Sequence, residues 1–298
     1  MKFLERHLAK QAVRRYFDAE GFIEIDSPIL IRSNAVEAFI DPIWVGAQEL
    51  RTSPELYHKR LLARGYKRIY ELGHVFRDEA EGRIHLREFS LLEWYRADAE
   101  LIDLIEDCQK LFFAVAPNLF NRPFEVQSLQ ELWLQHAKID LALALSNDNL
   151  VEVVLGAGFV LREQADFADA FHHVMMVAIE PCIGLDAPCV VTRWPKEMAA
   201  LSRLCEDDNR FAERFEIYFR GVELANAFLE LTDSLEQRNR FESEQQTRIQ
   251  LGKKASELDE DFLKDLDSMP PAAGIAVGFD RLMMFACDAS NISQICQF

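Results

Sequence analysis

The sequence lacks several features that would place it in a common class of protein. Its six cysteines form no CxxC pair, which argues against a zinc site or a disulfide framework and favours reduced thiols. No hydrophobic run reaches the length of a membrane-spanning helix, and the charged N-terminus lacks the apolar core of a signal peptide. We therefore expect a cytoplasmic protein that does not enter a membrane.

Positive charge is also scarce. The chain has 33 lysines and arginines against 50 aspartates and glutamates, a formal net charge of −17. A protein that held an RNA backbone over a wide surface would carry the opposite sign, so we expect no extensive nucleic-acid binding. One basic stretch, HKRLLARGYKR (58–68), is either a solvated helix face or a docking patch for an acidic partner. Its cationic residues are Lys59, Arg60, Arg64, Lys67 and Arg68.

No internal repeat, low-complexity segment or Pro/Gly/Ser-rich linker divides the chain, so we expect one domain over residues 1–298. The strands are irregularly spaced and several are joined by short turns, which favours an antiparallel sheet with helices packed on it, an α+β fold. The expected helices lie near 4–19, after TSPE (52–55), near 98–115, 128–175 and 234–250, and at the C-terminal end; the expected strands lie near 21–25, 69–79, 88–96, 188–194 and 213–230 and from 274.

The first candidate site is the hairpin YELGHVFRDEAEGRIHLREFSLLEWY (70–95). Side-chain alternation places polar groups on one face of each strand, and the loop between them carries further charges. The alternative is a solvated face with cross-strand ion pairs, although Phe89 and Tyr95 do not suit a fully solvated face. The residues concerned are Glu71, Gly73, Val75, Arg77 and Glu79 on the first strand, Glu81, Arg83, His85 and Arg87 in the loop, and Phe89, Leu91, Glu93 and Tyr95 on the second strand.

The second candidate site is RFEIYFRGVELANAFLE (214–230), in which Arg220-Gly221 suits a two-residue hairpin turn. With that turn Tyr218 faces Glu223 and Glu216 faces Ala225, so Glu216 and Glu223 become diagonal neighbours about 7 Å apart. Their repulsion, roughly 2 kcal/mol at an effective dielectric near 20, requires compensation. Either Mg²⁺ supplies it, or Arg214 or Arg220 pairs with one carboxylate. Glu230 is out of phase with Glu223 unless a bulge intervenes.

Three segments resemble the three motifs of class II aminoacyl-tRNA synthetases, in the family's order. GFIEIDSPIL (21–30) is similar to motif 1, the segment from Phe76 to Phe89 to motif 2, and GIAVGFDRLMMF (274–285) to motif 3. The resemblance implies ATP and Mg²⁺ as cofactors, with Arg77 and Arg281 as catalytic residues that neutralise phosphate charge. The implied ATP-binding residues are Arg77, Glu79, His85, Phe89, Glu223, Leu224, Gly278 and Arg281, and the implied metal ligands are Glu216 and Glu223.

Within this family, TSPELY (52–57), LLEWY (91–95) and ELANAFLELTD (223–233) resemble the lysine-specific branch. The resemblance implies that Glu230, with Tyr95, binds the side-chain ammonium of a lysine-like substrate, while Glu55 lies near the other amine. TSPE is equally a helix start, with Ser53 as N-cap and Pro54 at the first helical position. The implied substrate residues are Ser53, Pro54, Glu55, Glu93, Tyr95, Asn226, Phe228, Glu230 and Ala276.

The chain resembles most closely the lysine ligases that act on elongation factor P. As for these ligases, we expect no anticodon-binding domain, because the three motifs extend over almost all of the chain; Ala276 stands where lysyl-tRNA synthetases have glycine. The resemblance implies adenylation of (R)-β-lysine or lysine by ATP and transfer to a lysine of elongation factor P. It also implies a homodimer through motif 1, where Phe22, Ile25 and Ile29 are apolar.

Several positions depart from the ligase pattern. Leu86 replaces an asparagine in the motif 2 loop, Ala227 replaces a glycine, and Lys196 follows Trp194-Pro195. These departures leave open another acceptor, such as tRNA, a carrier protein or a small molecule. A non-catalytic lysine-binding paralogue is a further alternative, against which the retained motif residues argue.

Overall fold

The computed structural model describes residues 2–296, and the chain divides into two compact units. Unit 1 comprises the residues up to Leu119 and from Leu229 onward; unit 2 is Phe120–Phe228. The expectation of a single domain stays a prediction. Within residues 2–296, no helix combines the length and the apolar character that crossing a membrane requires.

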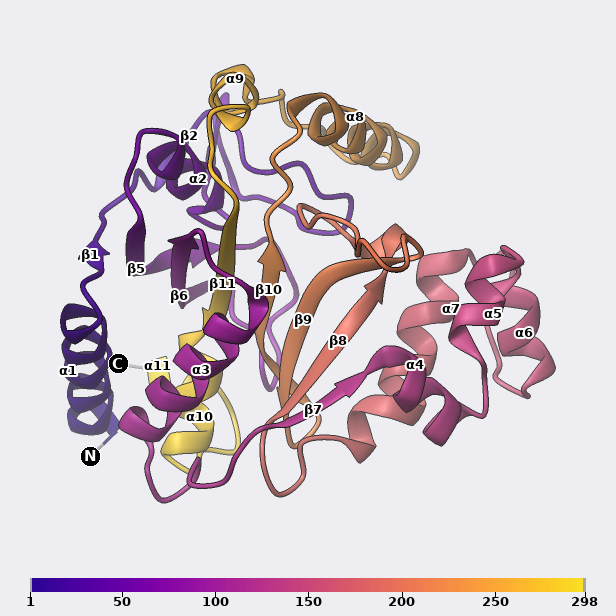
Figure 1. Ribbon diagram of the computed structural model, residues 1–298, viewed down its shortest axis with the longest axis horizontal. Helices are drawn as coiled ribbons and strands as arrows, with labels where there is room; N and C mark the ends of the chain where they lie inside the picture. The colour runs from indigo at the N-terminus through magenta and orange to yellow at the C-terminus, as the bar shows by residue number, and fades with distance from the viewer. Residues whose placement is uncertain (1, 297–298) are drawn as a thin grey trace. The chain divides into compact units, whose positions relative to one another are not determined.

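Unit 1 contains two groups of paired strands and several helices (Figure 1). One group is the part β1-β5-β6-β11 of the strand order, with β1 parallel to β5 and the other pairs antiparallel. The second has the order β2-β4-β3 and is antiparallel. The elements are α1 Lys2–Ala19, β1 Ile23–Glu24, β2 Leu30–Ile31, β3 Trp44–Val45, β4 Gln48–Leu50, α2 Glu55–Ala63, β5 Arg68–Phe76, β6 Glu88–Ala97, α3 Leu101–Val115, α8 Ser234–Gln250, α9 Glu260–Leu266, β11 Ala272–Gly278, α10 Phe279–Ala286 and α11 Ser293–Cys296.

An aromatic cluster packs α1 on the sheet of unit 1. The ring of Phe17 stacks on Tyr70 of β5 at 4.3 Å and lies edge-on to Trp94 of β6 at 5.3 Å. Phe22, just after the helix, contacts the same ring at 5.0 Å. These rings are fully or almost fully buried, and such pairs stabilise beyond their buried area. Phe22 is therefore a core residue and not the interface residue that the sequence suggested.

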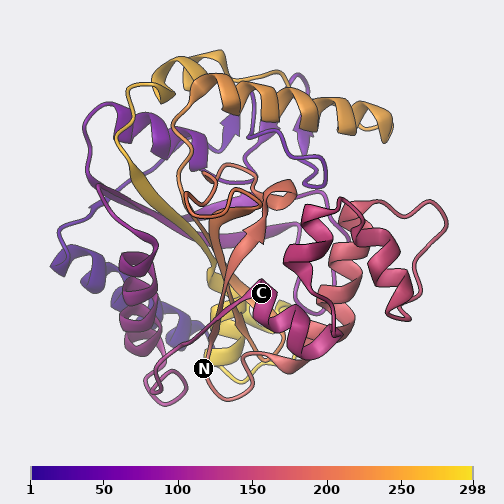
Figure 2. The same cartoon turned by 45° about the vertical axis from the view of Figure 1, so that its right-hand side comes forward.

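Unit 2 has a sheet of order β10-β9-β8-β7, in which only β7 and β8 are parallel. Figure 2 shows its helices, in magenta and pink, gathered in one cluster. Their core includes Trp133, Phe171 and Met175. The elements are β7 Glu125–Ser128, α4 Leu129–Leu132, η1 Trp133–Ala137, α5 Leu141–Ser146, α6 Leu150–Gly156, α7 Phe167–Val174, η2 Met175–Ile179, η3 Glu180–Cys182, β8 Cys189–Pro195, η4 Lys196–Met198, β9 Phe211–Phe219 and β10 Val222–Leu229.

The expected α+β fold is confirmed, with two corrections to its elements. The expected helical region 128–175 consists of short helices, because the chain turns with positive φ at Lys138, Asp148 and Gly158. Strand β5 ends at Phe76 instead of residue 79, because the N–H of Asp78 donates to the carbonyl of Asp41 at 2.7 Å instead of across the hairpin.

The hairpin of β9 and β10 turns at Arg220-Gly221 as predicted, and both residues have positive φ (49° and 71°). Tyr218 pairs with Glu223, also as predicted. Glu216 pairs with Asn226, and the prediction of Ala225 is wrong because a bulge at Leu224 shifts the register by one residue. The bulge brings the even positions that follow it, and so Glu230 just beyond the strand, into phase with Glu223.

Candidate active site

Arg77 continues the β5–β6 hairpin beyond the regular strands. Its N–H donates to the carbonyl of Arg87 at 2.9 Å, and its guanidinium carbon lies 5.3 Å from the centre of the Phe89 ring. The Nε of Arg77 is buried and has no hydrogen-bond partner within residues 2–296. A cation held over an aromatic ring, with a buried donor still available, suits an anionic ligand.

Arg281 of α10 contacts the loop of the same hairpin. It lies in the first turn of α10, directly after Gly278, and its Nε donates to the carbonyl of Ile84 at 3.2 Å. Its NH2 lies 2.8 Å from Nε2 of His85. Asp280 does not cap it, because that carboxylate pairs with Arg6 and accepts from the N–H of Ser90 at 2.8 Å. Two of the predicted ATP-binding residues, Arg281 and His85, are therefore in contact.

A group of acidic residues is buried where α2, β6 and β11 meet. Ser53 donates to Oε1 of Glu93 at 2.6 Å, and the hydroxyl of Tyr95 donates to Oε2 of Glu93 at 3.2 Å. The ammonium of Lys59 lies 2.6 Å from Glu55 and 2.6 Å from Oε2 of Glu230. We call these six residues the amine pocket; they are Ser53, Glu55, Lys59, Glu93, Tyr95 and Glu230.

The pKa values of the amine pocket reflect its excess of carboxylates. Burial, followed by the nearby Glu55, raises the pKa of Glu93 to about 8. Burial also raises the pKa of Glu230 to about 8, although Lys59 opposes the shift. Burial disfavours the charged form of Lys59, but Glu230 and Glu55 outweigh it and raise the pKa of Lys59. Three carboxylates share one cation, so the pocket favours a ligand that brings positive charge.

Glycine at position 274 of β11 makes this arrangement possible. A Cβ there would lie 2.2 Å from Oε1 of Glu230 and 2.3 Å from the Tyr95 ring. Ala276, two residues further along β11, pairs directly with Glu93 of β6. The strand therefore forms one wall of the amine pocket, and its small side chains set the room available beside the acids.

A second buried set of polar groups supports Tyr95. The His58 ring lies edge-on to the Tyr95 ring at 5.4 Å, and its Nε2 is 3.1 Å from Glu71. Glu71 also forms an ion pair with Arg51 at 2.6 Å and accepts from Ser27 at 2.7 Å. Burial opposes ionisation of Glu71, but the hydrogen bonds from His58 and Ser27 outweigh it and lower its pKa.

In unit 2, each carboxylate oxygen of Glu216 has a partner on the same strand, β9. Arg214 lies 2.5 Å from Oε1 of Glu216, and the hydroxyl of Tyr218 donates to Oε2 at 2.6 Å. The Arg214 guanidinium is itself held between Trp194 and Phe228, 4.5 and 5.5 Å from the ring centres. Burial, followed by Glu223, still raises the pKa of Glu216 to about 7. The compensation by Arg214 that the sequence left open is present, and it is incomplete.

The structure thus brings together most of the predicted site residues within each unit. In unit 1 it joins Ser53, Glu55, Glu93, Tyr95, Glu230 and Ala276 in one place, and it joins Arg77 to Phe89 and Arg281 to His85 along the hairpin. Glu79, partly buried, follows β5 and precedes the hairpin loop. Pro54 precedes α2 instead of starting it, and Ser53 accepts from the N–H of Glu55 at 3.0 Å. In unit 2, Leu224 forms the bulge and Asn226 lies opposite Glu216.

The basic stretch 58–68 is divided between the interior and the surface, since Arg64, Lys67 and Arg68 are exposed. A docking patch for an acidic partner stays a prediction for these three residues. Lys59 is buried in the amine pocket, and Arg60 pairs with Asp265 of α9 at 3.0 Å. Arg64 and Lys67 also lie within 4 Å of carboxylates. Lys59 and Gly274 are the site residues that the sequence did not single out; the i,i+4 spacing of Glu55 and Lys59 was the available signal for the first.

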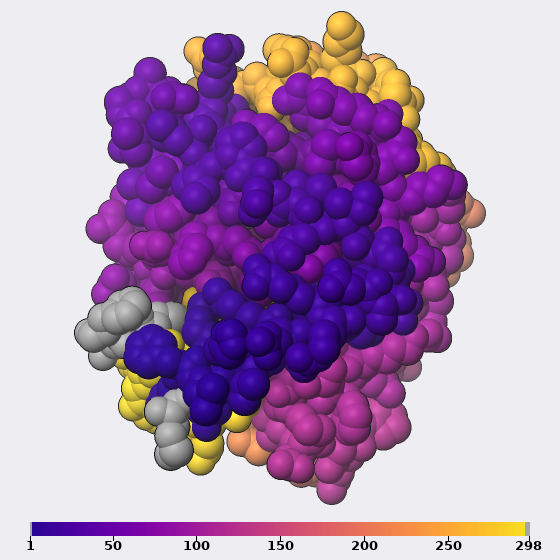
Figure 3. Space-filling model, turned by 90° about the vertical axis from the view of Figure 1, so that its left-hand side faces the viewer, coloured from indigo at the N-terminus to yellow at the C-terminus, as the bar shows by residue number. Residues whose placement is uncertain are grey.

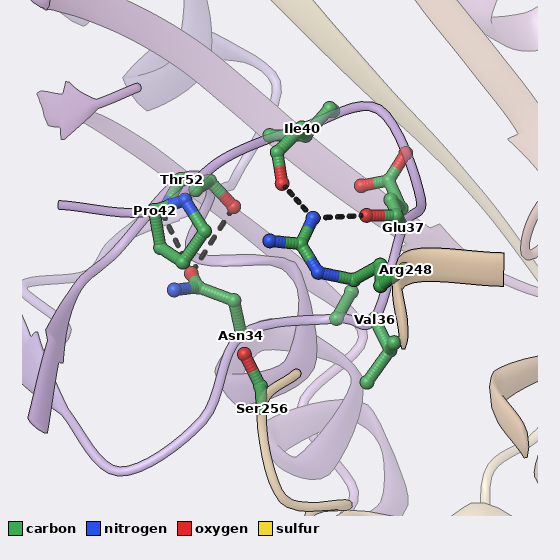
Figure 4. A pocket seen from close by; sticks show the side chains of 9 residues that line it. Asn34, Val36, Glu37, Ile40, Pro42, Thr52, Arg248 and Ser256 are labelled. Atoms are coloured by element: carbon green, nitrogen blue, oxygen red, sulfur yellow. Dashed lines mark hydrogen bonds between the residues drawn. The ribbon is translucent and has the colours of Figure 1, made fainter. Parts of the chain in front are cut away.

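A small pocket elsewhere in unit 1 is not this site. It has a volume of about 10 Å³, room for about one water molecule. Arg248 of α8 reaches into it and donates to the carbonyls of Glu37 and Ile40, each at 2.8 Å (Figure 4). Arg248 also donates to Asp41 at 2.8 Å. The hydrogen bonds from Arg248 fix the loop before β3. In that loop the carbonyl of Asp41 accepts from the N–H of Asp78, the residue next to Arg77.

Comparison with known proteins decides the family. The family model for class II tRNA synthetases (D, K and N) matches residues 1–298. The chain belongs to this family. The family match confirms the class II fold. The resemblance to the elongation factor P lysine ligases is confirmed by similar proteins that are named elongation factor P–(R)-β-lysine ligase. That of Hamiltonella defensa is 36% identical, over 96% of this chain and 91% of its own length.

Two further relatives of the same name cover nearly the whole synthetase-like chain. The protein of Pectobacterium atrosepticum is 36% identical and that of Erwinia tasmaniensis 37% identical. Each alignment covers 99% of this chain and 94% of the relative. Both units of this class II synthetase therefore fall within the aligned region.

Proposed function

We propose that this protein activates (R)-β-lysine, or lysine, with ATP and transfers it to a lysine side chain of elongation factor P. The amine pocket carries the proposal. Glu93 and Glu230 are buried, Glu55 is half-buried, and the one cation paired with this group, Lys59, contacts only Glu55 and Glu230, so the ammonium groups of a diamine would stabilise the ionised carboxylates. The names of the relatives support the same substrate and acceptor.

The proposed reaction has two steps. The substrate carboxylate attacks the α-phosphate of ATP and pyrophosphate leaves; then an acceptor amine attacks the acyl carbon, AMP leaves and the amine loses a proton. Arg77 neutralises charge on the α-phosphate, while Phe89 stacks under the adenine and Glu79 accepts from its amino group. Arg281, held by His85 and Ile84, binds the γ-phosphate, and Gly278 at the start of the same helix contributes to nucleotide binding. Leu224 of unit 2 stays a predicted ATP-binding residue.

We propose Glu216 and Glu223 as the ligands of Mg²⁺. Two carboxylates together with phosphate oxygens form the donor set that this hard cation prefers. The raised pKa of Glu216 supports the fit, because it marks a carboxylate that Arg214 does not fully compensate. Within residues 2–296, no cluster of three His, Cys, Asp or Glu side chains could hold a metal by itself. The bound cation would neutralise negative charge on the polyphosphate. On β10, Asn226 pairs with Glu216 and Phe228 pairs with Arg214.

The two units act in this proposal as one catalytic domain, since the family model spans both. The acceptor is a translation factor, which supports a cytoplasmic location. We also propose a homodimer through the face in Figure 3, where the indigo N-terminal residues lie exposed. Ile23, Ile29 and Leu30 of this N-terminal segment are 51%, 44% and 42% exposed. Light scattering of Ile29→Asp should give a monomer and Leu235→Asp, on α8, a dimer; a monomeric wild type would refute the proposal.

Pyrophosphate exchange with a panel of amino acids tests the activation step. We expect exchange with (R)-β-lysine or lysine and none with leucine. Mass analysis of elongation factor P after incubation with ATP and the preferred amino acid tests the transfer. Exchange without modification of that protein would favour another acceptor, and no exchange with any diamine would refute the enzyme.

A further inference from the structure

The ammonium group of Lys59 occupies the amine pocket, where it pairs with Glu55 and Glu230. Lys59 is 1% exposed and projects from α2, four residues after Glu55. Its ammonium touches Glu55 and Oε2 of Glu230 at 2.6 Å each. Burying a lysine between two glutamates has a desolvation penalty that the ion pairs only partly offset. We therefore expect a functional role for Lys59.

The two oxygens of Glu230 differ in their surroundings. Both oxygens are buried without a hydrogen bond of good geometry within residues 2–296, but Oε2 forms the ion pair with the Lys59 ammonium at 2.6 Å. Oε1 lies against the backbone of Gly274 and next to the Tyr95 ring. A buried carboxylate oxygen without a donor is costly unless a ligand supplies one.

We propose that Lys59 is a positioning residue that holds Glu230 through Oε2 and thereby directs Oε1 to accept the side-chain ammonium of the substrate. The inference rests on the proposed function of the amine pocket. Lys59 has two effects there. It fixes the rotamer of Glu230, and its positive charge favours the ionised form of Glu230, which a substrate ammonium requires.

The charges around the pocket give this role a pH dependence. Lys59 and Glu55 face Glu230 from α2, and Glu93 and Tyr95 lie on β6. After burial, the three glutamates raise the pKa of Tyr95. Lys59 is the group that lowers the pKa of Glu230. Without it Glu230 would hold its proton to higher pH and could not pair with an ammonium. Loss of Lys59 should therefore shift substrate recognition toward higher pH.

The test compares substrates that differ only in the side-chain amine. Binding of (R)-β-lysine and of (R)-3-aminohexanoate is measured by calorimetry, and pyrophosphate exchange with the same pair, between pH 6.5 and 9.5. In Lys59→Met we expect the preference for the diamine to fall at least about tenfold at pH 7. It should recover at a pH about one unit higher or more, and KM for ATP should change less than about twofold.

Matched variants separate positioning from packing. Lys59→Gln also lacks the charge and should show the same loss if Lys59→Met does not fold, whereas Lys59→Arg should restore the preference. Arg60→Gln, on the same helix but paired with Asp265, should behave as the wild type. If neutral variants keep the diamine preference and pH profile, the inference is wrong. If the wild type itself shows no preference for the diamine, the proposed function fails and the inference with it.

Discussion

Ala276 of β11 pairs directly with Glu93 of β6, so its methyl group lies at the wall of the amine pocket. Ala276→Gly should enlarge the room beside Glu93 and move the preference from β-lysine toward α-lysine. A single methyl is worth about 1–3 kcal/mol, or roughly 10–200-fold in discrimination. Pyrophosphate exchange with both isomers measures the ratio. Ala273→Gly, on the opposite face of the same strand, should leave the ratio unchanged; an equal shift in both variants would indicate a backbone effect.

Gly274→Ala should damage the amine pocket with little effect on ATP. The new Cβ would lie 2.2 Å from Oε1 of Glu230 and 2.3 Å from the Tyr95 ring, so both must move. We expect a loss of about 1–3 kcal/mol in the free energy of unfolding. A displaced carboxylate should also lower the rate of exchange with lysine by about 100-fold. Urea unfolding and exchange kinetics check both effects.

Gly156→Ala is the matched control, because a Cβ at the end of α6 meets nothing within 4 Å. It should unfold at the same urea concentration as the wild type or a slightly higher one. A Gly274→Ala protein with wild-type KM for the amino acid would show that Glu230 and Tyr95 do not bind the substrate.

The sequence could predict the elements and most of the site, because each rests on local signals. Alternation placed Glu93 and Tyr95 on one face, and Arg220-Gly221 marked the turn that the structure contains. The register of Glu216 could not be predicted, because the bulge at Leu224 carries no glycine or proline to announce it.

The composition of the amine pocket was also only partly predictable. Lys59 lies in a run of basic residues, and only its spacing of four from Glu55 distinguishes it locally from Arg60, which pairs with α9. Its burial depends on Glu230, a residue 171 positions later in the sequence. Contacts of that separation follow from the tertiary fold and leave no periodic trace in the sequence.

Glu216→Gln should weaken the response to Mg²⁺ more than the response to lysine. The amide keeps the shape and can still accept from Tyr218, but it carries no charge for a cation. We expect the Mg²⁺ concentration for half-maximal exchange to rise about tenfold or more. Titrating Mg²⁺ at fixed ATP and lysine measures this. Glu213→Gln, nearby on β9, is the control; the metal assignment fails if the two variants respond alike.

Arg248→Met should destabilise the loop that supports the hairpin. Arg248 donates to Glu37, Ile40 and Asp41, and Asp41 accepts from the N–H of Asp78 beside Arg77. Losing charged hydrogen bonds in a buried place should cost about 3 kcal/mol or more, and KM for ATP should rise. Thermal unfolding and exchange kinetics measure both. Arg238→Met, on the exposed side of the same helix, should leave the melting temperature nearly unchanged.

Glu93 makes stability depend on pH in a predictable direction. Its pKa is about 8 in the folded protein against 4.5 for an ordinary glutamate. Between these values the folded state binds more protons than the unfolded state, so the free energy of unfolding falls as pH rises. Glu93→Gln resembles the protonated form and can keep partners in Ser53 and Tyr95. The variant should match the wild type at pH 5.

At pH 8 Glu93→Gln should be more stable than the wild type by about 3–4 kcal/mol, since each pH unit between the two pKa values corresponds to about 1.4 kcal/mol. Urea unfolding at pH 5, 6.5 and 8 without ligand measures the difference. Glu260→Gln, an exposed glutamate that pairs with Arg238, should show no such gain with pH. If the difference between Glu93→Gln and the wild type stays constant over this range, Glu93 titrates normally, and the excess of buried negative charge that underlies the amine pocket is absent.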